Sequence, residues 1–309
     1  MKVAAEVAAA VEQREPVVAL ESTVFSTLGL PVPHNREAIE TAHDTIRNAG
    51  AVPALTAIIR GEATVGVSRE DWDLVLTADR KVAARDLAVA VGQRWPVGVT
   101  TVSATMTLAH AAGIRVFATG GIGGVHADPG TGEDVSADLH ALSSIPVLTV
   151  CAGAKSFLDL ARTLERLETL SVPVLGWQTS ELPAFTAATS GLSVPHRVDS
   201  AEEVARIAAA QFGLSPDAFP RPAGPHPGLL VTVPPPEPID DDVLARATTQ
   251  AEAAAVARGI SGPALTPFIL GEIAERTQGA SVAANVTLVA HNAAIASSIA
   301  VALGQTHRP

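Results

Sequence analysis

Short runs rich in valine, isoleucine and leucine alternate along this chain with alanine-rich stretches whose apolar residues have helical spacing. Parallel strands covered by helices on both faces are apolar throughout, so this alternation predicts an α/β fold with a mostly parallel sheet. The strands are predicted at residues 16–20, 55–59, 64–67, 115–118, 146–151, 173–177 and 229–233. The helices are predicted at residues 36–48, 82–93, 103–112, 156–170, 201–212, 241–257, 266–277 and 282–301.

The chain of 309 residues has room for one large α/β domain or two smaller ones, and we expect a single domain spanning residues 1–309. With 47% apolar and 17% charged residues, the composition excludes a disordered chain. The proline-rich stretch 215–228 is interpreted as a surface excursion, with a domain linker as the alternative.

The formal charge of −11 argues against binding to nucleic acid polymers or anionic membranes, because both require basic surface. Cys151 is the single cysteine, which excludes an internal disulfide. Glu6 and Glu12 interrupt the apolar opening that a signal peptide would need, so that segment suits an amphipathic helix. Asn285, His291 and Asn292 also interrupt the apolar stretch 281–303. We therefore expect a cytoplasmic protein.

Lys155 follows an apolar strand in the stretch VLTVCAGAKS, and we expect it at the start of the next helix. Ligands of open parallel sheets bind at the carboxyl ends of strands. The positive end of a helix dipole disfavours a cation, which would favour the neutral amine that a Schiff-base nucleophile requires. A lysine reaching back to solvent is the alternative. The order Gly-Ala-Lys-Ser excludes a P-loop.

A glycine-rich stretch, ATGGIGGVH, follows the strand predicted at 115–118 and contains Thr119 and His126. Backbone N–H groups of such a segment can bind a phosphate, and glycines that serve a tight turn are the alternative. Since His126 occupies the position of the third glycine, the stretch is not a dinucleotide-binding motif.

The acidic stretch 128–138 clusters Glu133, Asp134 and Asp138 near Ser136. Carboxylates without thiolates suit a hard cation such as Mg²⁺ or Mn²⁺, and a solvated acidic loop is the alternative.

Glu21 ends the first predicted strand, where a partly buried carboxyl group can have a raised pKa and act as a general acid. A capping or turn role is the alternative. Lys81 and Arg85 form either an anion clamp or a solvated helix face.

The chain resembles the pseudouridine-5′-phosphate glycosidase family over almost its whole length. The resemblance rests on ordered segments: VVALESTVFS, PALTAIIRGEATVGVS, KVAARDL, TTVSATMTLAHAAGIRVFATGGIGGVH, DVSADLHAL, VLTVCAGAKSFLDLARTLERLETLSVPVLGWQT and TPFILGEIAERTQGASVAANVTLVAHNA. It implies a three-layer α/β/α enzyme with Mn²⁺, one cation per subunit, that assembles as a homotrimer. The implied reaction reversibly converts pseudouridine 5′-phosphate and water into uracil and ribose 5-phosphate.

By position in these segments, the resemblance implies that Lys155 is the covalent nucleophile and Glu21 the proton donor. It places Lys81 and Val102 in contact with substrate and Asp134 on the metal. Further substrate-binding residues are implied at Ser136, Ala137, Asp138, Thr119, His126 and Asn285.

The chemistry fits this set, because a carbon leaving group is poor and a lysine adduct divides one difficult step into easier ones. The chain departs from the family pattern at Thr27–Pro31, where it has an extra residue, and at Val233, where the family has asparagine before proline. A related indigoidine-cluster enzyme acting on another phosphorylated C- or N-glycoside, a Schiff-base aldolase for sugar phosphates and a non-catalytic nucleotide-binding regulator remain alternatives.

Overall fold

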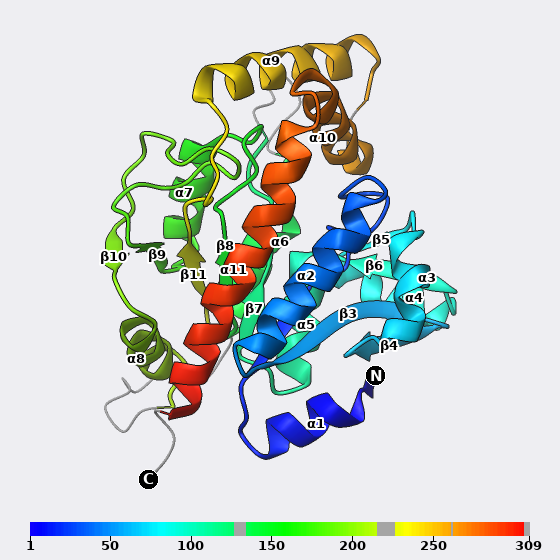
Figure 1. Cartoon of the computed structure of the whole chain (residues 1–309), viewed down its shortest axis with the longest axis vertical. Coiled ribbons are helices and arrows are strands. Elements are labelled where there is room, and N and C mark those ends of the chain that lie inside the picture. The colour runs from blue at the N-terminus through cyan, green and yellow to red at the C-terminus, as the bar shows by residue number, and fades with distance from the viewer. Residues whose placement is uncertain (127–133, 215–225, 261, 306–309) are drawn as a thin grey trace.

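The computed structural model describes residues 1–126, 134–214, 226–260 and 262–305 (Figure 1). Within these residues the strands are β1 (Lys2–Val3), β2 (Val17–Leu20), β3 (Val52–Ile59), β4 (Glu62–Val65), β5 (Lys81–Val82), β6 (Val97–Thr100), β7 (Val116–Ala118), β8 (Leu148–Cys151), β9 (Val174–Trp177), β10 (His196–Val198) and β11 (Leu229–Thr232). The helices there are α1 (Ala5–Glu12), α2 (His34–Asn48), α3 (Trp72–Leu76), α4 (Leu87–Gly92), α5 (Val102–Ala111), α6 (Ala137–Ser144), α7 (Leu160–Thr169), α8 (Ala201–Gln211), α9 (Asp241–Ala257), α10 (Leu265–Arg276) and α11 (Ala280–Gln305).

The strands form one mostly parallel sheet, which confirms the predicted α/β fold. Its order is β1-β4-β3-β2-β7-β8-β11-β9-β10, with β6 paired to β3 and β5. The first half of β3 runs parallel to β2, and its second half runs antiparallel to β4 and β6. The long curved β3 therefore joins the main sheet to a smaller, partly antiparallel end (Figure 1).

Helices cover both faces of the main sheet, which gives three layers. On one face, α11 lies beside α2 and α8, and Val18 and Leu20 of β2 point into that core (Figure 1). Val17 and Ala19 point into the opposite core, which contains residues of α1, α5, α6 and α7. Burial on both faces is why the central strands are mostly apolar, with buried threonines at Thr149 of β8 and Thr232 of β11.

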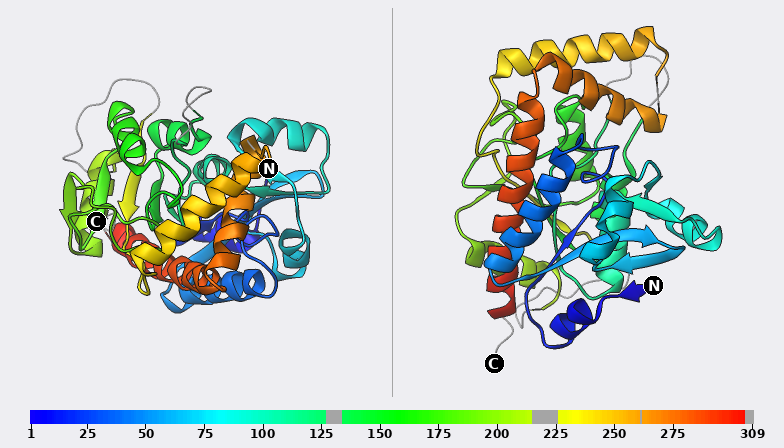
Figure 2. Two further views of the ribbon diagram at one scale, coloured as in Figure 1. Left: turned by 90° about the horizontal axis from the view of Figure 1, so that it is seen from above. Right: turned by 45° about the vertical axis from the view of Figure 1, so that its right-hand side comes forward.

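Helix α11 is long and apolar enough to cross a membrane by length and composition, and it is the only such helix in the described part of the chain. Of its most apolar window, 67% is buried inside the fold, where it packs on β2, β7 and β8. This burial is typical of the core helix of a three-layer protein. Helices α9 and α10 pack on one another at one end of the molecule (Figure 2).

Two helix predictions were wrong in ways that matter for the site. Residues 82–93 form the end of β5, a 3₁₀ turn and α4 rather than one helix. The helix predicted at 156–170 begins only at Leu160, where Asp159 caps it by accepting the N–H of Arg162 at 2.9 Å. Lys155 thus lies in a loop five residues before α7, beyond the first turn in which a helix dipole acts. The dipole of α7 therefore gives no reason for the amine of Lys155 to be neutral, contrary to our expectation.

Other elements were absent from the sequence prediction for physical reasons. β6 contains Gly98, whose Cβ would lie 2.6 Å from the Val82 side chain, so close packing requires a glycine in a strand. β10 has two exposed residues of three, and β1 and β5 have two residues each. Residues 215–225 of the predicted surface excursion lie outside the described residues, so that interpretation stays a prediction.

Candidate active site

Three neighbouring strands bring the predicted site residues to one edge of the sheet. The register pairs Leu20 of β2 with Ala118 of β7, and Ala118 with Val150 of β8. The next residues on the first two strands, Glu21 and Thr119, therefore lie side by side. Beyond β8 the chain continues along the glycine-rich stretch, where the N–H of Lys155 donates to the carbonyl of Ile122 at 3.2 Å. Sheet pairing thus places a carboxyl group after β2 and an amine after β8 at the same edge of the sheet, with β7 between the two strands.

A cavity of about 860 Å³ opens at this edge of the sheet. Ten of the eleven predicted site residues line it: Glu21, Lys81, Val102, His126, Asp134, Ser136, Ala137, Asp138, Lys155 and Asn285. Helix α10 contributes to the far wall through residues that include Pro267 and Leu270. Thr119 is 1% exposed and is absent from the lining. The structure thus brings together residues that are up to 264 positions apart in the sequence.

Glu21 lines this cavity as a buried carboxylic acid, with 7% of its surface exposed. Burial raises the pKa of its carboxyl group from 4.5 to about 7, because desolvation disfavours the carboxylate. The positive charge of Lys155 and a hydrogen bond from Thr119 oppose this rise, as Lys81 does to a smaller extent, while Asp138 adds to it. Glu21 can therefore hold or release a proton near neutral pH, which suits a general acid.

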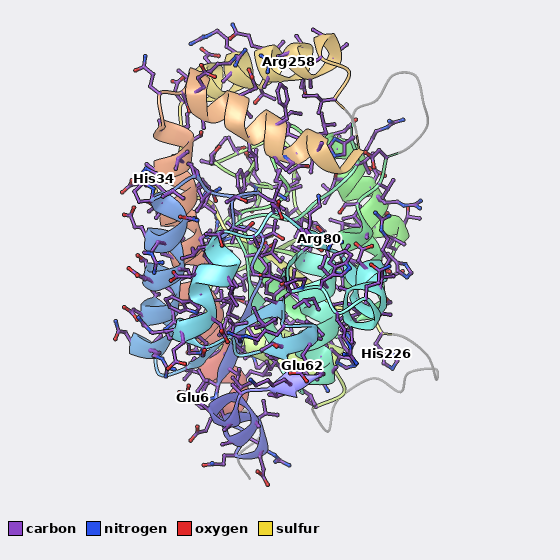
Figure 3. All side chains as sticks on the ribbon, turned by 90° about the vertical axis from the view of Figure 1, so that its right-hand side faces the viewer. Glu6, His34, Glu62, Arg80, His226 and Arg258 are labelled. Carbon is purple, nitrogen blue, oxygen red and sulfur yellow. The ribbon has the colours of Figure 1, made fainter. Side chains whose placement is uncertain are left out.

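Two of the chain's three lysines, Lys81 and Lys155, lie in this cavity, and the third, Lys2, lies on β1. Burial, followed by the nearby charge of Lys155, lowers the pKa of Lys81. Arg80 and Arg85 also line the cavity, and Arg80 stacks on the ring of Trp95 with its guanidinium carbon 3.4 Å from the centroid. Figure 3 labels Arg80 on the face of the molecule below α10. These four cations share the cavity lining with the carboxyl groups of Glu21, Asp79, Asp86, Asp134 and Asp138.

The glycine-rich stretch serves close packing rather than a turn. None of Gly120, Gly121, Gly123 and Gly124 has a positive φ, but a Cβ on Gly121 would lie 2.7 Å from the Phe185 ring. A Cβ on Gly123 or Gly124 would overlap Ser136 or Thr163, respectively. The amide of Gly123 donates to the carboxylate of Asp138 at 3.0 Å, so that amide is used within the protein.

Asp138 joins three parts of the cavity wall. Its Oδ1 accepts the N–H of Ser103 at the start of α5, and its Oδ2 accepts the N–H of Gly123, both at 3.0 Å. Its own N–H donates to Oγ of Ser136, which caps α6. Asp138 is 6% exposed. Through these bonds it fixes the positions of Ser136 and Ala137, the predicted substrate contacts at the N-terminus of α6.

His126 and Asp134 lie next to this cap, where Val125 and Val135 form an isolated antiparallel bridge. The N–H of His126 donates to the carbonyl of Asp134 at 2.9 Å, and its ring lies 6.0 Å from that of Phe157. Burial lowers the pKa of His126, which favours the neutral imidazole, while Asp134 opposes this shift.

The donor set around Asp134 fits a hard cation that keeps most of its water. Asp134 is exposed and lines the cavity, whereas Glu133 and residues 128–132 of the acidic stretch lie outside the described residues. In the described ranges no three His, Cys, Asp or Glu residues are grouped as metal ligands. Mg²⁺ and Mn²⁺ sites commonly use one or two carboxylates together with water and substrate phosphate, so a single carboxylate that lines the cavity is compatible with such a site.

Helix α11 contributes two buried amides. Asn285 lines the cavity, and its Oδ1 has no hydrogen-bond partner within the described residues. Asn292 is 1% exposed, and its Nδ2 donates to the carbonyl of Thr119 at 2.8 Å. Sequence reasoning treated Asn292 only as an interruption of an apolar stretch. A polar residue inside an otherwise apolar helix was the available signal.

Phe185 is a cavity residue that sequence reasoning missed. It is 5% exposed, has a φ of 61°, and lines both the main cavity and an adjoining one of about 260 Å³. Positive φ is uncommon for a bulky residue and costs of order 1 kcal/mol, so surrounding contacts must hold it. Its N–H donates to the carbonyl of Ala152 at 2.9 Å. No local sequence pattern marks this loop.

Comparison with known proteins connects this cavity to a family. Residues 6–302 match the family described as indigoidine synthase A like protein. A pseudouridine-5′-phosphate glycosidase from Herpetosiphon aurantiacus is 48% identical over 98% of this chain and 98% of its own length. One from Myxococcus xanthus is 46% identical over 96% of each chain.

Solved structures agree in fold. A prealnumycin C-glycosynthase in complex with ribulose 5-phosphate has a TM-score of 0.86 and 33% identity, covering 99% of this chain and 98% of its own. An indigoidine synthase A-like protein from Thermotoga maritima has a TM-score of 0.84 and 34% identity, covering 98% and 96%.

Proposed function

Because this chain belongs to the indigoidine synthase A like family, we propose that it is a pseudouridine-5′-phosphate glycosidase. The reaction reversibly converts pseudouridine 5′-phosphate and water into uracil and ribose 5-phosphate. One observation carries the mechanism: the buried carboxyl group of Glu21 and the amine of Lys155 line the same cavity at one edge of the sheet. These are the acid and the nucleophile that cleavage of a sugar-to-carbon bond requires.

In the first step Lys155 attacks C1′ of the ribose while Glu21 gives its proton to the ring oxygen. The C1′–O4′ bond breaks, and the ring-opened sugar remains attached to the lysine nitrogen. A carboxyl group with a pKa of about 7 is protonated in a large fraction of molecules at neutral pH, which suits this donation.

In the second step the lysine nitrogen, which became an ammonium on attack, loses its extra proton, and a proton is added to the uracil carbon that bears the sugar. The C–C bond then breaks, the lysine nitrogen supplies the electron pair that forms an iminium, and neutral uracil leaves. Water hydrolyses the iminium and releases ribose 5-phosphate and the free amine. The covalent adduct replaces one difficult departure of a carbon group by several easier steps.

The phosphate is proposed to bind beside Lys81 and the N-terminus of α6, where Ser136 and Ala137 line the cavity. A helix N-terminus and a nearby ammonium group both attract an anion. Binding energy from this remote group orients C1′ toward Lys155. A divalent cation held by Asp134 would add positive charge close to the sugar phosphate.

Four further properties belong to the same proposal. The enzyme uses Mn²⁺, one ion per subunit, works in the cytoplasm and assembles as a homotrimer that binds neither nucleic acid polymers nor membranes. Light scattering of the purified protein, with a mass three times 31.6 kDa expected, tests the assembly. A monomer mass would refute it.

A second candidate is synthesis or cleavage of a C–C bond between a sugar phosphate and another aglycone. The observation in its favour is the structural similarity to the prealnumycin C-glycosynthase, which was solved with ribulose 5-phosphate. Both candidates place a sugar phosphate near Lys155, so the aglycone distinguishes them.

The test is to incubate the protein with pseudouridine 5′-phosphate and Mn²⁺ and to follow uracil by chromatography. We expect uracil from wild type and from the control Lys2→Ala, and none from Lys155→Ala. Borohydride added with ribose 5-phosphate should trap a sugar adduct on wild type only, detected by mass spectrometry. An adduct without uracil release would favour the second candidate, and full activity of Lys155→Ala would refute the mechanism.

A further inference from the structure

Thr119 contacts Glu21, the proposed acid, from the protein interior and does not line the cavity. Its Oγ1 donates a hydrogen bond to Oε1 of Glu21, and the two residues are 1% and 7% exposed. Glu21 lines the cavity, whereas Thr119 does not. A protonated carboxyl group has one oxygen that carries the proton and one that only accepts. Because Oε1 accepts from Thr119, the proton belongs on Oε2.

Asn292 holds the backbone that carries this hydroxyl. Its Nδ2 donates to the carbonyl of Thr119 at 2.8 Å and lies 3.4 Å from the carbonyl of Gly120. Its Oδ1 has no partner among the described residues, although Asn292 is 1% exposed. A buried amide whose oxygen is unpaired is costly, so the side chain contributes through its donor. A residue of α11 therefore fixes the peptide after β7.

We propose that Thr119 and Asn292 are positioning residues for Glu21, which orient its carboxyl group so that Oε2 presents the proton to the cavity. This inference rests on the proposed role of Glu21 as proton donor and deepens it. The proposal gives Thr119 a role other than the predicted substrate contact. A hydroxyl that donates to Glu21 and is shielded from the cavity is poorly placed to bind substrate.

The groups that face Glu21 determine the pH dependence. Burial raises its pKa, and Asp138 does so too, whereas Lys155, Thr119 and Lys81 lower it. Removing the Thr119 hydroxyl removes a bond that favours the carboxylate, so the pKa of Glu21 should rise further. An acid that must be protonated then stays active to higher pH, and the alkaline limb of kcat should move up by about one pH unit.

The informative variants are Thr119→Val, which keeps the shape without the donor, and Thr119→Ser, which keeps the donor. We expect Thr119→Val to lower kcat at neutral pH by about tenfold, with a smaller change in KM, and to shift the alkaline limb upward. Thr119→Ser should retain the wild-type limb. Asn292→Leu should shift the limb in the same direction as Thr119→Val, because the hydroxyl is then held less firmly.

Ser297→Ala is the matched control on the same helix. Ser297 is also buried, but its hydroxyl donates to the carbonyl of Ala293 within α11. We expect a wild-type pH profile for this variant. If the alkaline limb of the pH dependence of kcat in Thr119→Val matches that of wild type, the proposal is overturned. This holds whether or not the substitution also lowers the stability of the protein. A raised KM with unchanged kcat and limb would also overturn it and would make Thr119 a substrate contact.

A second measurement separates this proposal from the proposed function. The carboxyl ¹³C signal of Glu21, assigned by its loss in Glu21→Gln, can be titrated in the resting enzyme without any substrate. An upward shift of its midpoint in Thr119→Val supports the positioning role even if wild type releases no uracil, in which case only the proposed reaction fails. An unchanged midpoint would refute the positioning role.

Discussion

Replacing Glu21 by glutamine should stabilise the protein at alkaline pH while it abolishes turnover. Burial raises the pKa of Glu21 from 4.5 to about 7, so the unfolded chain ionises at lower pH than the folded chain. A group with a raised folded-state pKa contributes its full stability below pH 4.5 and loses it as pH rises to about 7. Above that pH, the native state carries a carboxylate in a site that disfavours it.

The size of the effect follows from the shift. About 2.5 pH units at about 1.4 kcal/mol each correspond to about 3 kcal/mol of free energy of unfolding. Typical total stabilities are about 5–15 kcal/mol, so this is a measurable fraction. Glutamine has nearly the same shape, carries no charge and keeps the oxygen that accepts from Thr119. At pH 8 the variant should melt roughly 5–10 °C above wild type, and at pH 4.5 the difference should vanish.

Urea denaturation of wild type and Glu21→Gln at pH 5 and pH 8, followed by circular dichroism, measures this difference. Glu165→Gln on α7 is the matched control, because Glu165 is exposed and lies outside the cavity lining. We expect the control to have the same small effect at both pH values. A stability difference between wild type and Glu21→Gln that does not change with pH would refute the argument that Glu21 titrates near neutrality in the folded protein.

Three shorter predictions concern the rest of the cavity. Lys81→Ala should reduce activity on pseudouridine 5′-phosphate by about tenfold to over a hundredfold, since a charge-assisted contact contributes about 1.5–3 kcal/mol. Activity on unphosphorylated pseudouridine should fall much less. Equal losses on the two compounds would place Lys81 away from the phosphate. Chelation of divalent cations should remove most activity, and added Mn²⁺ should restore it. Asp134→Ala should raise the Mn²⁺ concentration that is required for activity. Full activity after exhaustive chelation would show that Asp134 has no role in metal binding. Gly123→Ala should lower the melting temperature and the activity together, because its Cβ would lie 2.9 Å from Oδ2 of Asp138; unchanged melting and kinetics would show that the close contact is unimportant.

The central strands were predictable because both of their faces are buried. A short apolar run in the sequence predicted each of five strands, and the structure has a strand at each place: β2, β7, β8, β9 and β11. The register of the sheet then explains why reasoning about strand ends found Glu21 and Lys155. Strands that lie at an edge or pack through glycine, such as β10 and β6, lack this signal.

The start of α7 was misplaced although a local signal existed. Asp159 caps the helix, but Ser156, Phe157 and Leu158 before it were interpreted as the first helical turn. Phe185 and the pairing of Asn292 with Thr119 were beyond local reasoning, because each depends on segments far apart in the sequence. A polar residue in an apolar helix indicates that a buried partner exists, but it does not identify that partner.

The position of α11 in the sequence has a consequence for biosynthesis. The ribosome synthesises Glu21, Thr119 and Lys155 well before residues 280–305, which form α11. This helix supplies Asn285 to the cavity, and its Asn292 binds the carbonyl of Thr119. It also covers one face of β2, β7 and β8. A growing chain, or a fragment that stops before residue 280, would hold the reactive lysine and the acid on a sheet with one uncovered face. Catalytic competence should therefore arise late, when α11 docks, and incomplete chains should be recognised by their exposed apolar surface before they can react with sugar phosphates.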